Sequence, residues 1–530
     1  MKKLRLIALF LALIFVLSAC GKNSGGQQSN ADPGSQPGTD SGGPAGDGGI
    51  TITAGIAKLP TSFNLIEYGT SIQMQLVFEG LFRVNPSTGD VEPMLADSWD
   101  YIDDLTLKIK LRDDVYFACG EKLTADTVLH SLSSYTDPSK NSTQAMYYFV
   151  YDFENSYAED DLTLILKTHA PYGPGIANLA RNPDIFCKSC YDGFSDADLW
   201  DHACGTGPYS VVENVSGSHS TLSLRGDYWN KAKTPAVDTF TIRGYSEVST
   251  MFIDFENGAL DVVFTLDDSS YQRLLAGGVQ GATVKAPSLY DLYYITLPEY
   301  VEAFNDVRVR EAFTIAVDWA IVGDIALGSL AELPTSNVSS TAAPFYVNQG
   351  AYKYDPDRAR QLLADAGYPD GGVVLNCLVS TLPTEMRVFE SMQGYLSEVG
   401  IDMRFEAFES SSVMPRIAGG ETDLFILGPM AGTPVTDPAL TMTHAHAGAF
   451  LRPCVISDPV YNGYWDTGSN SIDQATRIEA YKNAQEWLHN NYRHIPIIEP
   501  KTAFAFHNSV IADLDVNNTF NPSLIWLKLA

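Results

Sequence analysis

The chain has 530 residues, of which 64 are acidic and 34 basic, so its formal net charge at neutral pH is −30. The sequence offers no basic cluster to neutralise phosphates, which excludes nucleic acid as a partner. Hydrophobic residues make up 45% of the chain, and a chain this long exceeds a single core, so we expect two or three lobes.

The first 20 residues have the pattern of a signal peptide. The cationic start MKKLR precedes the apolar run LIALFLALIFV, which is too short to span a bilayer and leads into a polar stretch. The run ends in LSAC at 17–20, which resembles a bacterial lipobox, so we expect Cys20 to receive a diacylglycerol and become the mature N-terminus. The alternative is an ordinary signal peptide with a chance cysteine. Two acyl chains hold a protein stably at a membrane, which predicts a lipid-anchored protein on the outer face of the cytoplasmic membrane or in the periplasm.

Residues 21–49 are rich in Gly, Ser and Pro and contain almost no apolar side chain. Such a segment buries too little surface to offset its ordering entropy, so we expect a flexible tether. At Ile50 the sequence changes to ITITAGI, where β-branched residues alternate, and the folded part is expected to begin there.

Beyond Ile50 the sequence alternates between strand and helix patterns without an internal repeat, which suits lobes built on mixed sheets. Thr124 and Asp355 are placed to cap helices, and Gly367 is placed to end one. The clearest expected elements are strands at 51–56, 105–112 and 494–500 and helices at 124–135, 355–367 and 477–492.

Five blocks together carry a resemblance to a known family. In chain order they lie at 76–128 (LVFEGLF to TADTV), 205–209 (GTGPY), 304–318, 352–368 and 477–500. Their order and spacing resemble family 5 of the extracytoplasmic solute-binding proteins of ATP-driven importers, the oligopeptide, dipeptide and nickel-binding family. The resemblance runs from about residue 50 to the C-terminus.

The resemblance implies an α/β fold in which two lobes of mixed sheets clamp a solute, as in periplasmic binding proteins of class II or cluster C. The first lobe of this family is discontinuous and carries an extra subdomain, and hinge strands are expected at 292–297 and 502–508. Closure of the hinge buries the ligand and forms the surface that the permease recognises. The implied divisions are lobe I at 50–83, 205–292 and 508–530, the extra subdomain at 84–204, and lobe II at 293–507.

The GTGPY block is not a phosphate loop, because no Lys-Ser/Thr follows its glycines and no third glycine opens a helix. Pro208 and Tyr209 lead into SVVENV, which alternates as a strand. We therefore expect a strand-entry turn, with Gly205 and Gly207 at positions that need unusual φ angles.

Six cysteines remain once Cys20 is lipidated, an even number for an oxidising compartment. Cys204 follows Cys187 and Cys190 closely enough for a short disulfide loop to either one, which would join the end of the extra subdomain to lobe I. The alternatives are free thiols or a metal site in which His202 joins the cysteines. Extracytoplasmic thiols tend to pair, which favours the disulfide.

His444 and His446 lie two residues apart, so on a strand they share a face and in a loop they can ligate a metal or a chelated metal. The alternative is a pair of surface or polar-core histidines. No HExxH motif, nucleophile elbow or evident carboxylate pair accompanies them. We therefore expect neither catalysis nor a cofactor.

The resemblance also implies a ligand site, from which this chain departs. Peptide-binding members carry an aromatic residue and an Asp that pairs with the peptide ammonium in the segment corresponding to 426–438, and a buried ammonium does need a carboxylate. This chain instead has Pro429, Met430 and Gly432, and its nearest acid is Asp437. These four residues, with Tyr68 and Trp465, are the candidate ligand contacts.

The expected function is therefore that of a lipid-anchored, monomeric binding protein that delivers an oligopeptide or dipeptide to the permease of an ABC importer. The first alternative is the same role for a chelated metal, nickel-like, or another small solute, bound with His444 or His446. The second is a secreted metal-dependent hydrolase that uses His202 and the cysteines.

Overall fold

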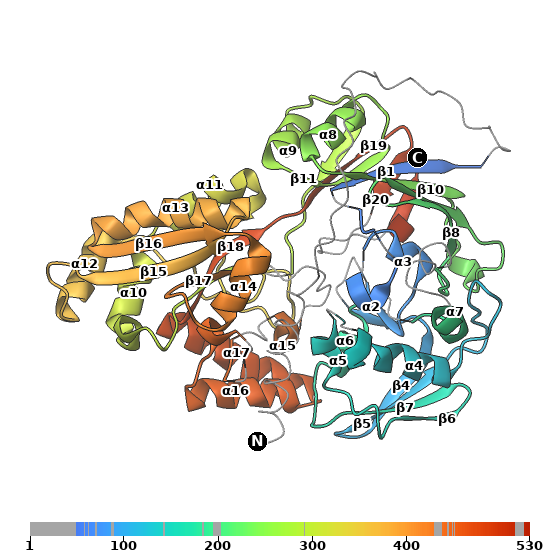
Figure 1. Cartoon of the computed structure of the whole chain (residues 1–530), viewed down its shortest axis with the longest axis horizontal. Coiled ribbons are helices and arrows are strands. Elements are labelled where there is room, and N and C mark those ends of the chain that lie inside the picture. The colour runs from blue at the N-terminus through green and yellow to red at the C-terminus, as the bar shows by residue number, and fades with distance from the viewer. Residues whose placement is uncertain are drawn as a thin grey trace, which may run out of the picture.

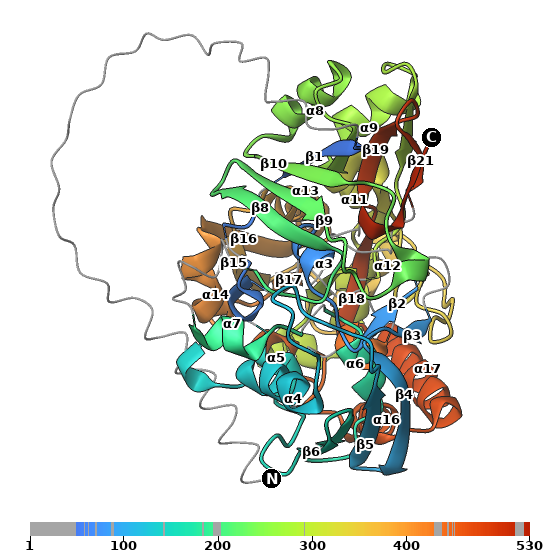
Figure 2. The same ribbon diagram turned by 90° about the vertical axis from the view of Figure 1, so that its right-hand side faces the viewer.

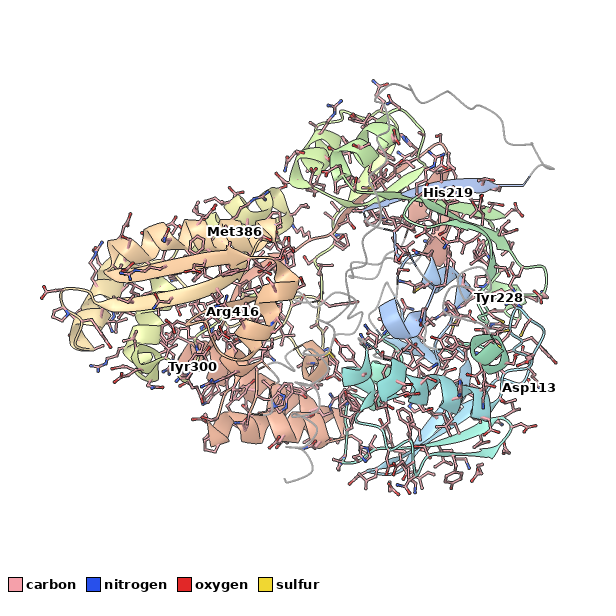
Figure 3. The ribbon with its side chains drawn as sticks, viewed as in Figure 1. Asp113, His219, Tyr228, Tyr300, Met386 and Arg416 are labelled. Carbon is pink, nitrogen blue, oxygen red and sulfur yellow. The ribbon has the colours of Figure 1, made fainter. Side chains whose placement is uncertain are left out.

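The computed structural model describes residues 49–530 apart from 58, 62, 69–70, 86–89, 141, 143, 183–184, 194–202, 291, 429–436, 442–444, 448, 450 and 515–523. The expected signal peptide, Cys20 and nearly all of the expected tether lie outside the described residues. Two lobes stand side by side, with helices and sheets in both (Figure 1). Figure 3 places Tyr300, Met386 and Arg416 on one lobe and Asp113, His219 and Tyr228 on the other half.

Lobe I is built on a seven-stranded sheet, in which β1 is parallel to both of its neighbours and the other pairs are antiparallel. The β-branched alternation expected at its start buries Ile52, Ala54 and Ile56. Helices α8 (Val248–Glu256) and α9 (Asp268–Leu275) pack on the sheet beside β11 and β12. In spatial order the strands are β12 (Ala282–Lys285), β19 (Ala503–His507), β11 (Val262–Leu266), β1 (Thr51–Ala57), β10 (Thr239–Tyr245), β9 (His219–Leu224) and β8 (Tyr209–Val215).

The extra subdomain contains a four-stranded antiparallel sheet, covered by helix α4 (Ala125–Ser134). The expected cap is present, because the Thr124 side chain accepts from the Thr127 backbone N–H at 3.3 Å. Leu107 of this sheet and Phe240 of lobe I belong to one continuous buried cluster, so the subdomain shares the core of lobe I. Its sheet order is β4 (Ala96–Asp103), β5 (Thr106–Leu111), β7 (Thr163–Lys167) and β6 (Tyr157–Asp160).

Further short elements belong to this half of the molecule, and Figure 2 shows α3 and α6 among them between the sheet of lobe I and that of the extra subdomain. The helices among them are α2 (Leu65–Tyr68), α3 (Met74–Val77), α5 (Ala145–Tyr148), α6 (Gly175–Leu179) and α7 (Lys188–Gly193). The strands are β2 (Phe82–Val84) paired with β3 (Val91–Pro93), and β20 (Ile511–Leu514) paired with β21 (Leu527–Leu529).

Lobe II combines a four-stranded sheet, β14 (Ala331–Glu332), β18 (His494–Pro500), β13 (Tyr293–Thr296) and β17 (Phe425–Leu427), with the parallel pair β15 (Val373–Ser380) and β16 (Ile401–Phe408). All seven residues of β18 are buried, as its apolar sequence predicts. The helices of the lobe are α10 (Val307–Ile315), α11 (Trp319–Leu327), α12 (Pro356–Asp365), α13 (Pro383–Glu398), α14 (Ser410–Ala418), α15 (Pro438–Thr441), α16 (Pro459–Asn470) and α17 (Gln474–Asn491).

Two of the lobe II helices follow their sequence signals closely. Asp355 caps α12 by accepting from the Arg358 N–H at 2.9 Å, and Gly367 just beyond it adopts φ +100°. Helix α17 starts three residues earlier than expected, because Asp473 supplies a cap that accepts from the Thr476 N–H at 2.8 Å.

The expected boundary at 507/508 is wrong. Strand β19 pairs with β11 and β12, so 503–507 belong to the sheet of lobe I and the chain leaves lobe II after β18. Pairing with partners more than two hundred residues away decides this boundary, and no local pattern encodes it.

Candidate functional site

Two chain segments cross between the lobes, and they lie side by side. One joins β12 to β13 and the other joins β18 to β19 (Figure 1). The backbone of Leu289 donates to the Pro500 carbonyl at 2.8 Å and that of Thr502 donates to Pro287 at 3.0 Å, with an antiparallel bridge between Ser288 and Lys501. A paired crossing of this kind lets a few residues absorb the rotation of one lobe against the other.

The lobes also touch beside this hinge. The Asp268 carboxylate of α9 accepts from both the backbone N–H and the hydroxyl of Ser329, at 2.8 and 2.6 Å. Gly328 before it has φ +62°, and a Cβ there would lie 2.3 Å from the Asp268 carboxyl carbon. Glu332 of β14 accepts from Lys501 at 2.5 Å and from Ser288 at 3.2 Å, and so ties both crossing segments to lobe II.

A second contact between the lobes lies far from the hinge. The backbone N–H of Gly173, in the extra subdomain, donates to the Ser469 carbonyl of α16 at 2.7 Å. A Cβ on Gly173 would lie 2.2 Å from the Ser471 carbonyl oxygen and 2.4 Å from Nε of Arg477, so only glycine allows this approach. The two lobes therefore meet both beside the hinge and at this second contact.

A buried ion pair lies next to this second contact. Arg477 of α17 donates to both carboxylate oxygens of Asp437 at 2.7 and 2.6 Å, and its Nε donates to the Gly468 carbonyl at 2.8 Å. Burial alone lowers the pKa of Arg477, but the charge and hydrogen bonds of Asp437 outweigh it and raise that pKa. Burial, and then the nearby Asp437 carboxylate, raise the pKa of Tyr172.

This pair gives Asp437 a structural partner. Its side chain is 5% exposed, and the guanidinium of its own chain already neutralises its charge. The sequence predicted Asp437 as a stand-in for the acid that binds a ligand ammonium. In the structure its bidentate bond goes to Arg477 instead.

Trp465 lies on α16 and is 6% exposed, packed edge-on against Tyr481 at 5.8 Å between ring centroids. The His446 ring stacks on it in parallel, at 4.9 Å and an interplanar angle of 5°. Trp465 and Tyr481 belong to a small core of lobe II, so packing rather than an open face accounts for the burial of Trp465.

The other candidates lie wholly or partly outside the described part of the chain. Pro429, Met430 and Gly432 fall there, as do His444 and His202. Tyr68 ends helix α2, and its side chain is likewise outside the description. They remain predictions.

The GTGPY block is a turn that opens β8 at Tyr209, as expected. The reason given for its glycines is wrong, because neither has a positive φ. A Cβ on Gly205 would lie 2.0 Å from the Val77 carbonyl oxygen and one on Gly207 would lie 2.6 Å from that of Leu76. The glycines are needed for close backbone packing.

A buried carboxylate that no sequence pattern indicated lies beside this turn. Glu79 accepts from the Tyr228 hydroxyl at 2.8 Å, from Trp229 Nε1 at 2.8 Å and from the Thr206 hydroxyl at 2.9 Å. Burial raises the pKa of Glu79 to about 7, against the lowering effect of these hydrogen bonds. The network joins the first and second family blocks, because Glu79 lies in one and Thr206 in the other.

The described cysteines are free in the structure, and the bond from Cys204 to Cys187 or Cys190 stays a prediction. A fourth thiol, Cys119, joins these three, and all four sulfurs lie within 4.8 Å of one another. The sequence missed Cys119 because it stands alone, far upstream of the other three.

Within the described range, no single helix is both long and apolar enough to cross a membrane. The bent pair of α10 with the segment Trp319–Leu330 passes the same test of length and composition. Its residues Val309, Phe313 and Val322 are buried in the core of lobe II.

Comparison with known proteins agrees with this architecture. Residues 90–450 match the family described as "Bacterial extracellular solute-binding proteins, family 5 Middle". The glutathione-binding protein GsiB of Pectobacterium atrosepticum is 25% identical over 77% of this chain and 80% of its own length. Heme-binding protein A of Haemophilus influenzae is 24% identical over 93% of this chain and 94% of its own length.

Solved structures share the fold. The periplasmic binding protein DppA from Helicobacter pylori, in complex with the peptide STSA, superimposes with a TM-score of 0.73 at 20% identity, over 91% of this chain and 98% of its own. NikA from Brucella suis, in complex with Fe(III)-EDTA, superimposes with a TM-score of 0.77 at 20% identity, over 91% of this chain and 100% of its own. The two-lobe α/β fold is confirmed, and the hydrolase alternative is excluded because the family consists of binding proteins. The chain belongs to family 5 of the bacterial extracellular solute-binding proteins, which bind small ligands and deliver them to the permeases of ABC importers.

Proposed function

We propose that this chain is a lipoprotein, anchored through Cys20, that acts as a monomer and captures an oligopeptide or dipeptide for an ABC importer. The solute lies between the lobes, and the permease recognises the closed form. The expected site residues Tyr68, Pro429, Met430 and Gly432 line the ligand.

The observation that carries this proposal is the paired crossing between the lobes. Hydrogen bonds such as Leu289 N–H to the Pro500 carbonyl hold the two segments together, so the lobes turn about one axis. The contact of Gly173 with Ser469 lies on the far side and serves as the point where the lobes meet. A ligand that contacts both lobes stabilises the closed arrangement by its difference in affinity for the two states.

The peptide class is supported by the printed ligands of related proteins. GsiB is named for glutathione, itself a small peptide, and the DppA complex contains a tetrapeptide. The names of two other relatives, heme-binding protein A and NikA with Fe(III)-EDTA, keep a chelated metal as the second candidate. That candidate would use His446, which stacks on Trp465, or His444.

Thermal stabilisation separates the two ligand classes. The mature chain would be titrated with peptides of two to five residues, and in parallel with heme and with nickel and iron chelates. A ligand at 100 times its Kd stabilises the folded state by about 2.7 kcal/mol, which raises Tm by roughly 3 °C for a folded part of this size. Peptides that raise Tm while the chelates do not support the proposal, and the reverse result contradicts it.

A further inference from the structure

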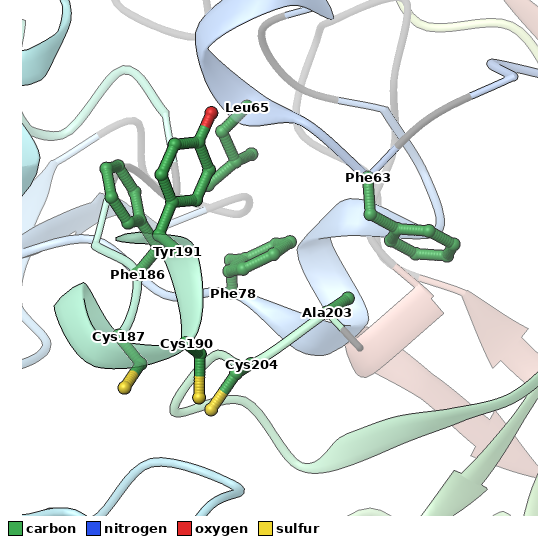
Figure 4. Close-up of a pocket in the computed structure, with 9 residues that line it drawn as sticks. All are labelled: Phe63, Leu65, Phe78, Phe186, Cys187, Cys190, Tyr191, Ala203 and Cys204. Atoms are coloured by element: carbon green, nitrogen blue, oxygen red, sulfur yellow. The ribbon is translucent and has the colours of Figure 1, made fainter. Parts of the chain in front are cut away.

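Four cysteines from three separate stretches converge beside the GTGPY turn. Cys119 lies in the loop after β5, Cys187 and Cys190 flank the start of α7, and Cys204 directly precedes the turn. Figure 4 shows the sulfurs of the last three pointing to the same side of the chain, away from the aromatic rings that line the rest of the pocket. All four sulfurs lie within 4.8 Å of one another.

This spacing fits one common ligand better than two separate bonds. In a tetrahedral zinc tetrathiolate, Zn–S bonds of about 2.3 Å set every sulfur about 3.8 Å from the other three. The sulfurs of Cys119 and Cys187 are 3.5 Å apart. Disulfides would need pairs at about 2.05 Å, and they impose no short distance between one pair and the other.

The surroundings of Cys187 match those of a metal-bound thiolate. The Ser189 hydroxyl lies 3.4 Å from its sulfur, and the Cys190 backbone N–H also donates to that sulfur. Backbone donors of this kind fix and tune thiolate ligands in metal sites.

The site is open to a metal from one side. Cys119 is exposed and Cys190 and Cys204 are half-buried, whereas Cys187 is buried. One oxygen of the Glu121 carboxylate accepts from the Cys187 thiol at 3.4 Å, and the other accepts from the Ser189 hydroxyl. When Cys187 gives up its proton to a metal, Glu121 keeps the Ser189 hydroxyl as its donor.

The cluster also has a structural task that a metal can perform. The Cys187 N–H donates to the Cys204 carbonyl at 3.2 Å, and the Ala118 N–H donates to the Gly205 carbonyl at 3.0 Å. The chain therefore passes from the extra subdomain into lobe I at this point. A four-ligand metal would join both ends of the passage.

We propose that Cys119, Cys187, Cys190 and Cys204 bind one zinc ion as a tetrathiolate, which fixes the end of the extra subdomain to lobe I. The role is structural, since four protein ligands leave no open position for a substrate. It is independent of the transported solute.

Metal analysis tests the site directly. The mature chain would be purified without chelator, and its zinc content measured by plasma mass spectrometry. We expect about one zinc per chain, falling at least tenfold in Cys190→Ser, because loss of one thiolate opens a four-coordinate structural site. Cys377→Ser is the matched control, since that buried thiol lies in lobe II away from the cluster, and it should keep its zinc.

Cobalt and thiol alkylation supply the second readout. Zinc-free protein titrated with Co²⁺ should develop the intense sulfur-to-cobalt absorption and visible bands of a tetrahedral thiolate site, saturating at about one equivalent. Cys119→Ser removes the exposed member of the cluster and should weaken these bands. Thiols of the cluster that resist alkylation after chelation, and react only after reduction, would mean disulfides and would overturn the proposal. So would alkylatable thiols that bind neither Zn²⁺ nor Co²⁺.

Discussion

The buried pair of Asp437 and Arg477 gives the sharpest test of how this chain uses its acidic residues. Replacing Arg477 by methionine keeps the length and apolar stem of the side chain but removes the guanidinium. Asp437, 5% exposed, then loses the two hydrogen bonds from Arg477 and keeps that from the Ala439 N–H, and the Gly468 carbonyl loses its donor at 2.8 Å. Breaking one partner of a buried pair costs about 3–5 kcal/mol, because an uncompensated charge remains in the interior.

For a folded part of this size the entropy of unfolding is near 1 kcal/mol per degree, so Arg477→Met should lower Tm by roughly 3–5 °C. Differential scanning calorimetry measures the shift. The matched control is Arg404→Met on β16 of the same lobe, where the pair with Asp402 is exposed, at 65% and 50% for the two side chains. An exposed pair is worth about 0–1 kcal/mol, so this variant should lose at most about 1 °C.

Solute affinity decides between a structural and a ligand-binding role for Asp437. If the acid is committed to Arg477, Asp437→Asn lowers Tm but leaves the affinity of the folded protein for its solute within about threefold, a difference of roughly 0.7 kcal/mol. An unchanged Tm in Arg477→Met, together with a loss of binding in Asp437→Asn, would refute the reasoning and make Asp437 the partner of a ligand ammonium.

Three further predictions concern other parts of the chain. Because Glu79 has its pKa raised from 4.5 to about 7, its contribution to stability is full below pH 4.5 and is lost as the pH rises through 7. Relative to Glu79→Gln, the wild type should lose about 3 kcal/mol of unfolding free energy over that window in denaturant titrations. Gly205→Ala should lower the unfolding free energy by about 1–3 kcal/mol, since its Cβ would lie 2.0 Å from a carbonyl oxygen. Cys20→Ala should move the protein from the membrane fraction to the soluble fraction of fractionated cells, because no acyl chain is attached.

Each of these predictions has a control. For the pH effect, the comparison variant is Glu385→Gln, which removes a second acid whose burial raises its pKa to about 7. Equal pH profiles for Glu79→Gln and the wild type would contradict the account. For Gly205, the control is Gly226→Ala, where a Cβ meets nothing within 4 Å, and equal stability of the two variants would contradict the packing argument. For Cys20, a variant that stays in the membrane fraction would rule out the lipid anchor.

Local signals in the sequence predicted local structure well. The Asp355 cap, the burial of β18 and the turn before Tyr209 all follow from residues within a few positions of each other. The order of the family blocks predicted the two-lobe fold, because such an order reflects a whole topology.

Features that depend on distant partners were not predictable in the same way. Glu79 meets Thr206 and Trp229 across 127 and 150 residues, so no window of sequence shows the network. Cys119 reaches Cys187 across 68 residues and lacks the paired spacing that marks a metal or disulfide motif. The sequence suggested Asp437 as a ligand contact because its partner in the structure, Arg477 of α17, lies 40 residues further along the chain.

Native mass spectrometry of the mature chain, purified without refolding, shows whether the protein binds peptides. The account predicts bound small molecules whose masses and fragments are those of peptides, released when the protein unfolds. After the co-purified peptide has been removed, addition of a synthetic peptide with its sequence should restore the bound form. A co-purified heme or metal chelate that peptides cannot displace would contradict the account.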